Sequence, residues 1–110
     1  MPPGEFRNFE EFWPHYVGEH RHARTRHLHF AGTTVAIVMA AFAVLLLNGW
    51  LLLAALIVAY GFAWIGHFFI ESNKPATFRH PLWSVRGDLK MYCLMWRGRM
   101  ADEIRRLTPR

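Results

Sequence analysis

The 110-residue chain is 53% hydrophobic and carries a formal net charge of +5, with a mean hydropathy of +0.07. This length predicts a single domain over residues 1–110, and the lone Cys93 excludes an intramolecular disulfide and a CxxC metal site. Every Lys, Arg, Asp and Glu lies outside residues 30–70. A basic chain with so long an uncharged segment favours a membrane, and not nucleic acid, as its partner.

The N-terminal segment predicts a short helix. Asn8 and Glu11 have the spacing of a capping box, and Pro14 is expected to start or kink a helix. Aromatic side chains recur at roughly helical spacing and suit either a membrane interface or packing on the hairpin ends: Phe6, Phe9, Phe12, Trp13 and Tyr16. Residues 1–11 lack a signal-peptide pattern, so we expect the apolar segment that follows to belong to the mature protein.

Residues 15–29 (HYVGEHRHARTRHLH) hold five of the seven histidines. In one straight helix, His20 and His29 would lie about 180° apart around the axis and could not bind one ion. A break near Ala23–Thr25, with Thr25 as the N-cap of the next helix, would let His20 fold back toward His29.

Residues 30–70 predict two membrane spans of an all-α protein. A span needs about 20 apolar residues, and Asn48-Gly49 is a turn signal within this stretch. We therefore expect spans over about 30–47 and 50–70, joined by a tight turn. The alternative, a soluble hairpin buried in its own protein, is disfavoured because little chain remains to cover both helices.

Lys and Arg are missing from the tip of this hairpin and frequent on both sides of it. The positive-inside rule then predicts both termini in the cytoplasm. Small residues recur every four positions on each span, which favours close helix packing: Gly32, Ala36 and Ala40, then Ala55, Ala59 and Ala63. The second series continues to His67 and Glu71, which should face the protein interior.

The C-terminal part predicts a loop and an amphipathic helix. Pro75, Pro81 and Gly87 mark residues 72–87 as a loop, and Asp88 is expected to cap a helix that runs to about Leu107. One side of that helix is apolar and suits a membrane surface or packing on the hairpin ends: Leu89, Tyr92, Trp96, Met100 and Ile104.

The hairpin topology predicts a metal site. The start of the first span and the end of the second lie at the same depth, so His29 and His67 become neighbours, and His20 and His80 flank them. Three or four imidazoles suit Fe(II), Zn(II) or Cu(II). Glu71 either joins the ligands, orients a histidine or pairs with Lys74. For His15, His22 and His27 the favoured interpretation is contact with lipid headgroups.

Two segments resemble one known family along nearly the whole chain. EHRHARTRHLHFAGT (19–33) and GHFFIESNKPATFRHPLWSVRGD (66–88) resemble the Mpo1-like family, named after a 2-hydroxy fatty acid dioxygenase. The resemblance implies an integral membrane enzyme of fatty-acid α-oxidation that uses Fe(II) and shortens its substrate by one carbon. It implies His20, His29 and His67 as the catalytic metal ligands. His80, in the FRHPLWS run, resembles a feature of the bacterial branch of the family, and this likeness implies a bacterial inner membrane as the location. The Asn-Pro pair common after the first family histidine is His22-Ala23 here.

These observations give one main hypothesis and two alternatives. In the main one, iron binds the 2-hydroxy carboxylate and O2, and Arg26, Lys74 and Arg79 are candidates to hold the substrate carboxylate. The acyl chain would lie along the hairpin or in the adjacent lipid, and a homo-oligomer is left open. The alternatives are a non-enzymatic hairpin that binds lipid or shapes the membrane, and a zinc-dependent membrane hydrolase.

Overall fold

The computed structural model describes residues 6–74 and 79–107, in which all regular secondary structure is helical. The elements are α1 (Phe9–Gly18), α2 (Ala23–Leu45), α3 (Gly49–Ile65), the π-helical η1 (Gly66–Glu71), α4 (Pro81–Trp96) and α5 (Met100–Leu107). The all-α prediction is confirmed for these ranges. Residues 1–5, 75–78 and 108–110 lie outside the described residues, and Pro75 of the predicted loop is among them.

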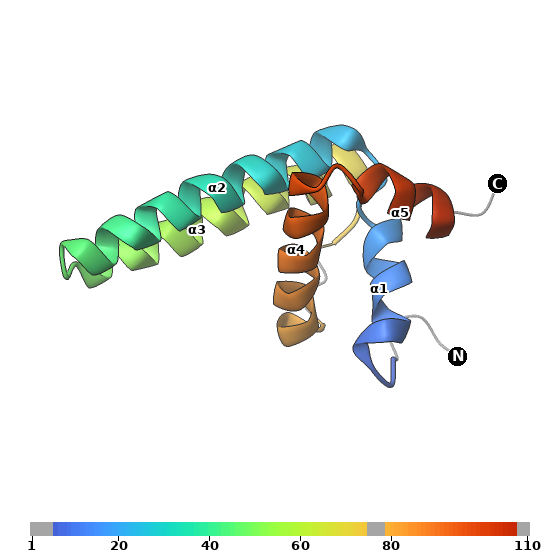
Figure 1. Cartoon of the computed structure of the whole chain (residues 1–110), viewed down its shortest axis with the longest axis horizontal. Coiled ribbons are helices and arrows are strands. Elements are labelled where there is room, and N and C mark those ends of the chain that lie inside the picture. The colour runs from blue at the N-terminus through green and yellow to red at the C-terminus, as the bar shows by residue number, and fades with distance from the viewer. Residues whose placement is uncertain (1–5, 75–78, 108–110) are drawn as a thin grey trace.

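Helices α2 and α3 form a long hairpin, and α1, α4 and α5 gather at its open end (Figure 1). The molecule measures 48 × 28 × 25 Å. By length and composition alone, Ala23–Leu45 and Gly49–Glu71 are each long and apolar enough to cross a membrane. Apolar side chains near the tip are exposed, among them Leu47 (92%) and Trp50 (80%). The rest of the described chain therefore leaves the tip of the hairpin uncovered.

The turn between the two long helices lies where the sequence predicts it. Asn48 caps α3, because its side-chain oxygen accepts a hydrogen bond from the Leu51 N–H at 3.3 Å. The left-handed residue of the turn is Leu47 (φ 50°), and not Gly49. The Asn48 N–H bonds back to the Ala43 carbonyl at 2.9 Å, a geometry that satisfies the last carbonyls of α2.

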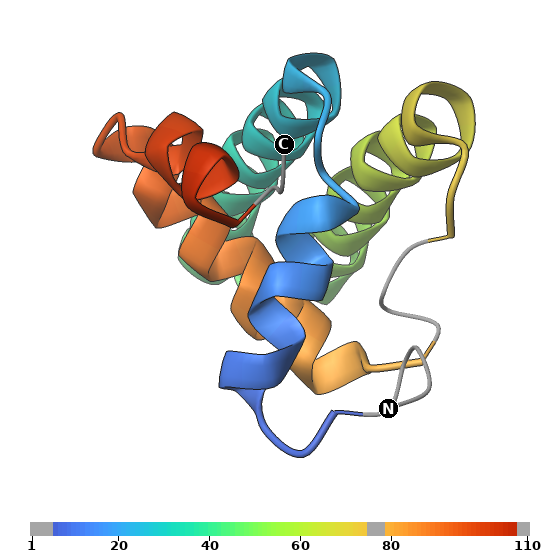
Figure 2. The ribbon, with the colours of Figure 1, turned by 90° about the vertical axis from the view of Figure 1, so that its right-hand side faces the viewer.

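The apolar core lies outside the hairpin, among α1, α4 and α5, which Figure 2 shows side by side. The aromatic series packs on α4 and α5, and not on the ends of the α2–α3 hairpin as one of the two interpretations expected. The buried aromatic residues of the series form one cluster with a valine of α1 and with methionines of α4 and α5: Phe9, Phe12, Trp13, Tyr16, Val17, Met91 and Met100. Trp13 also donates its Nε1–H to Glu103 at 2.9 Å, which fastens α5 to α1.

The prediction of one C-terminal helix beginning at Asp88 is wrong. Helix α4 begins at Pro81, because proline lacks an N–H and its fixed φ suits the first helical position. Asp88 consequently lies inside α4. The chain also breaks at Gly98, whose φ of +69° is a left-handed conformation that glycine adopts without strain. Met100 then begins α5.

Candidate metal centre

The required chain break lies between α1 and α2, at residues 19–22. It comes slightly earlier than predicted, so Thr25 is not the N-cap: His22 holds that position, and Thr25 lies fully buried in the first turn of α2. Asn8 caps α1 as expected, accepting from the Glu11 N–H at 2.9 Å, while Pro14 lies inside that helix and does not start it.

Three side chains hold the backbone of this linker in place. Arg26 donates from Nη1 to the carbonyl oxygens of His20 (2.8 Å) and Arg21 (2.7 Å). Glu71 accepts the His22 N–H at 2.8 Å. Asn73 donates from Nδ2 to the Glu19 carbonyl at 3.1 Å. The linker is thus fixed against both α2 and the end of η1, which places His20 over the hairpin.

His20, His29 and His67 come together at this point. They lie on the linker, α2 and η1, and they are 0%, 6% and 2% exposed. One possible ligand nitrogen from each lies within 4.8 Å of those of the other two. The ring centroids are 4.6 Å apart for His20 and His29, 4.5 Å for His20 and His67, and 5.3 Å for His29 and His67.

Hydrogen bonds select the free nitrogen of two of these rings. Nδ1 of His20 lies 2.6 Å from the Tyr16 carbonyl oxygen, which accepts its proton. Nδ1 of His67 lies 2.6 Å from Oδ1 of Asn73, whose amide nitrogen is directed to the Glu19 carbonyl. This network assigns the Nδ1–H tautomer to both rings and leaves Nε2 with its lone pair. Metal-binding histidines are commonly oriented in this way.

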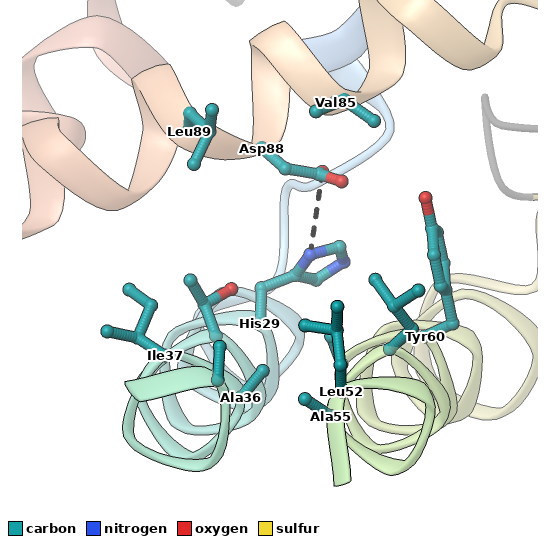
Figure 3. Close-up of a pocket in the computed structure, with 13 residues that line it drawn as sticks. His29, Ala36, Ile37, Leu52, Ala55, Tyr60, Val85, Asp88 and Leu89 are labelled. Carbon is teal, nitrogen blue, oxygen red and sulfur yellow. Dashed lines mark ion pairs between the residues drawn. The ribbon is translucent and has the colours of Figure 1, made fainter. Parts of the chain in front are cut away.

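Asp88 stands behind the third histidine. Its carboxylate faces Nδ1 of His29 at 3.8 Å (Figure 3). The same carboxylate accepts the Tyr16 hydroxyl proton at 2.5 Å. Burial raises the pKa of Asp88 to about 6, against the opposing effect of the Tyr16 hydrogen bond. Tyr16 therefore supports two histidines. It holds His20 directly, because its carbonyl oxygen accepts from that ring and its own ring stacks on the imidazole at 4.1 Å. It supports His29 through its hydrogen bond to Asp88.

The donor set fits a metal ion. Nε2 of His20 and Nε2 of His29 are buried and lack a hydrogen-bond partner among the described residues, a costly state that a bound ion would relieve. Burial, together with His29 and His67, lowers the pKa of His20 well below its ordinary value, so the ring stays neutral and able to ligate. Because metal–imidazole bonds measure about 2.1 Å, nitrogens that share one ion lie about 3.0–3.4 Å apart. Nitrogens that now lie within 4.8 Å of one another would have to draw together by up to about 1.5 Å.

The other histidines and cations lie elsewhere. His80 is not a member of the group of three, and its ring stacks on Trp83 and meets Phe12 edge-on. His22 and His27 are exposed, and His15 pairs with Glu19 at 3.1 Å. Lys74 and Arg79 are exposed at either side of residues 75–78. The Glu71 carboxylate accepts a hydrogen bond from the backbone N–H of His22. Glu71 is not among the three residues that could share a metal ion, and this hydrogen bond is with neither Lys74 nor a histidine ring.

Two glycines allow close packing beside the three histidines. A Cβ at Gly66, next to His67, would lie 2.7 Å from Cγ2 and 3.3 Å from Cα of Thr25. A Cβ at Gly32, one turn beyond His29, would lie 2.7 Å from the Cβ of Phe62. The close packing predicted for the small residues is therefore present at Gly32, and together with Gly66 it sets how closely α2 approaches α3 and η1. Other members of the two predicted series line an open groove: Ala36, Ala40, Ala55 and Ala59.

An apolar groove of about 280 Å³ begins at His29 and runs between α2 and α3 under α4 (Figure 3). Alanines from both long helices line it, and Val85, Asp88 and Leu89 of α4 close one side. His29 therefore belongs both to the group of three histidines and to the groove lining. Asp88, which faces His29, also lines the groove.

Comparison with curated proteins finds no match, and comparison with solved structures finds none either. The Mpo1-like family, described as "2-hydroxy-palmitic acid dioxygenase Mpo1-like", matches residues 6–100. That range includes all three clustered histidines, the linker and Asp88. The resemblance seen in the sequence is confirmed, and the chain belongs to the Mpo1-like family.

Proposed function

We propose that the protein is an iron-dependent membrane dioxygenase that shortens a 2-hydroxy long-chain fatty acid by one carbon. The observation that carries this proposal is the set of three buried histidines beside an apolar groove. The family description supports the reaction class and the substrate. The donor set supports a metal, and imidazole nitrogens suit Fe(II) among other ions.

In this proposal Nε2 of His20, His29 and His67 would hold the ion. Bound iron would supply redox chemistry toward O2 and a Lewis acid for the hydroxyl and carboxylate of the substrate. Tyr16 and Asp88 orient two of the ligands, and Asn73 orients the third. Burial of all three rings keeps water away from the reacting centre.

Lys74 and Arg79 remain our candidates to bind the substrate carboxylate. Both are exposed cations on the segment that follows His67. Arg26 was a third candidate, and its Nη1 is engaged with the linker carbonyls. We keep it as a candidate through its other guanidinium nitrogens, since arginine offers five N–H donors.

We also propose that α2 and α3–η1 span the bacterial inner membrane and that α1, α4 and α5 lie in the cytoplasm. Exposed Cys93 on α4 offers a test without mutation. A membrane-impermeant maleimide should label it in inverted membrane vesicles and leave it unlabelled in intact spheroplasts. Labelling in spheroplasts would reverse the orientation.

The activity is tested by oxygen uptake. Purified protein is reconstituted anaerobically with Fe(II), mixed with 2-hydroxypalmitate, and then exposed to oxygen. The proposal predicts oxygen consumption together with the fatty acid one carbon shorter, and no consumption with palmitate. Stoichiometric zinc without oxygen uptake would favour a membrane hydrolase. No stoichiometric metal would favour a non-enzymatic lipid-binding hairpin.

A further inference from the structure

We infer that the groove between α2 and α3 binds the acyl chain of the substrate, with the polar end at His29 and the methyl end toward the hairpin tip. The inference rests on the proposed function for the identity of the ligand. It goes beyond that function because it assigns a chain-binding site and the residues that set how much chain it holds.

The lining of the groove is polar at one end and apolar along its length. His29, Asp88 and Thr33 lie at the polar end. Beyond them the walls are alanines and aliphatic side chains of both long helices: Ala36, Ala40, Leu52, Ala55, Leu56 and Ala59. Such a gradient matches a molecule with one polar end and an unbranched apolar tail.

His29 provides evidence for a ligand that is independent of the alanines. This side chain is 6% exposed, it lines the groove, and its Nε2 has no hydrogen-bond partner in the described part of the chain. An unpaired buried nitrogen is costly unless something binds there. The groove therefore leads from a site prepared for a polar group or ion, and the occupant should reach that site.

The dimensions indicate how much chain the groove holds. Ala40 lies eleven residues beyond His29 on α2, which at about 1.5 Å per residue is about 16 Å. An extended chain advances roughly 1.2 Å per bond, so about 16 Å holds roughly thirteen bonds. Ala36 lies seven residues beyond His29, a distance that corresponds to roughly nine bonds.

The small alanine side chains of α2 and α3 leave the space of the groove open. Helices α2 and α3 touch at Gly32 and Phe62, so larger side chains at Ala36 or Ala40 would project into the groove that those positions line. Ala41 is the next residue on the same helix, is exposed and does not line the groove. Ala41 therefore supplies a matched control for any substitution at Ala40.

The test measures binding and does not depend on iron or turnover. Displacement of a fluorescent fatty acid by saturated 2-hydroxy acids of increasing length is measured in nanodiscs without added metal. The variants are Ala36→Phe, Ala40→Phe and Ala41→Phe. Affinity is expressed as the ratio of variant to wild type at each chain length, which cancels the partition of each acid into lipid.

The expected ratio stays near one for short acids and then falls. The fall should begin at roughly nine bonds for Ala36→Phe and at roughly thirteen for Ala40→Phe. It should reach about tenfold once nearly two methylenes are displaced, at about fourfold each. Ala41→Phe should remain flat, and Ala40→Val gives a smaller fall in the same place if the phenylalanine variants do not fold.

Two results would overturn the inference. One is a flat profile in every folded groove variant, the smaller Ala40→Val included. The other is an equal fall in Ala41→Phe, which would indicate a lipid-facing effect. Oxygen uptake is recorded in parallel on wild-type protein reconstituted with Fe(II). A shifted binding profile without any uptake by the iron-reconstituted wild type would preserve the acyl groove and reject the dioxygenase.

Discussion

The substitution Gly66→Ala tests whether close packing beside His67 organises the metal centre. The added Cβ would lie 2.7 Å from Cγ2 and 3.3 Å from Cα of Thr25, which is itself fully buried. Overpacking of this kind costs about 1–3 kcal/mol, and replacing a helical glycine by alanine returns about 1 kcal/mol. We therefore expect a net loss of about 1 kcal/mol in the free energy of unfolding.

Gly61→Ala is the matched control. Gly61 lies on the same apolar helical segment, Gly49–Glu71, and nothing lies within 4 Å of a Cβ added there. It should gain about 1 kcal/mol, which separates the two variants by about 2 kcal/mol. Denaturant unfolding in detergent measures the difference, and metal content should fall only in Gly66→Ala, where His67 is displaced. Equal stability of the two variants would refute the packing argument.

Two further predictions concern Asp88 with its partner Tyr16, and Glu103. Asp88→Asn and Tyr16→Phe should each lower metal affinity by about 10–100-fold with the fold retained, because each loosens the support of His29. Titration with Co(II) measures the affinity, and wild-type affinity in both variants would contradict the assigned role. Hydrogen bonds from Arg106 and Trp13 lower the pKa of Glu103 to about 2. Its contribution to stability is therefore present above pH ~4.5 and lost as pH falls from ~4.5 to ~2. The denaturation midpoint of Glu103→Gln should vary less than that of wild type over this range.

Local sequence signals predict much of the fold. Asn8 and Asn48 each cap a helix through their own side chains, so both helix starts can be found without tertiary information. The alanine series on the second long helix also predicts correctly that His67 is buried. These features depend on residues three or four positions apart, which is the spacing that a sequence displays directly.

The exact break before α2 depends on distant contacts. The linker is held by Glu71, which is 49 residues from its partner His22, and by Asn73, which reaches back to Glu19. Its described residues include neither Gly nor Pro between Glu19 and His22. No local pattern there distinguishes a break from a continuing helix, so Thr25 was the more plausible cap from sequence alone.

Asp88 was predicted as a helix cap and is instead the carboxylate behind His29. Its partner Tyr16 is 72 residues away, and the helix that presents it begins at Pro81. Pro81 is compatible both with a loop and with a helix start. An acidic residue within a mostly basic C-terminal segment was the available signal, and it becomes informative only once α1 and α4 are known to pack together.

The most direct test of the account is the metal content of purified protein and four variants, measured by elemental analysis after reconstitution with Fe(II). The account predicts about one iron per chain in wild type and in the control His27→Ala, whose side chain is exposed. It predicts strong loss in His20→Ala, His29→Ala and His67→Ala, each of which removes one of three ligands. Iron retained at the wild-type level in all three variants would contradict the metal centre and the function built on it.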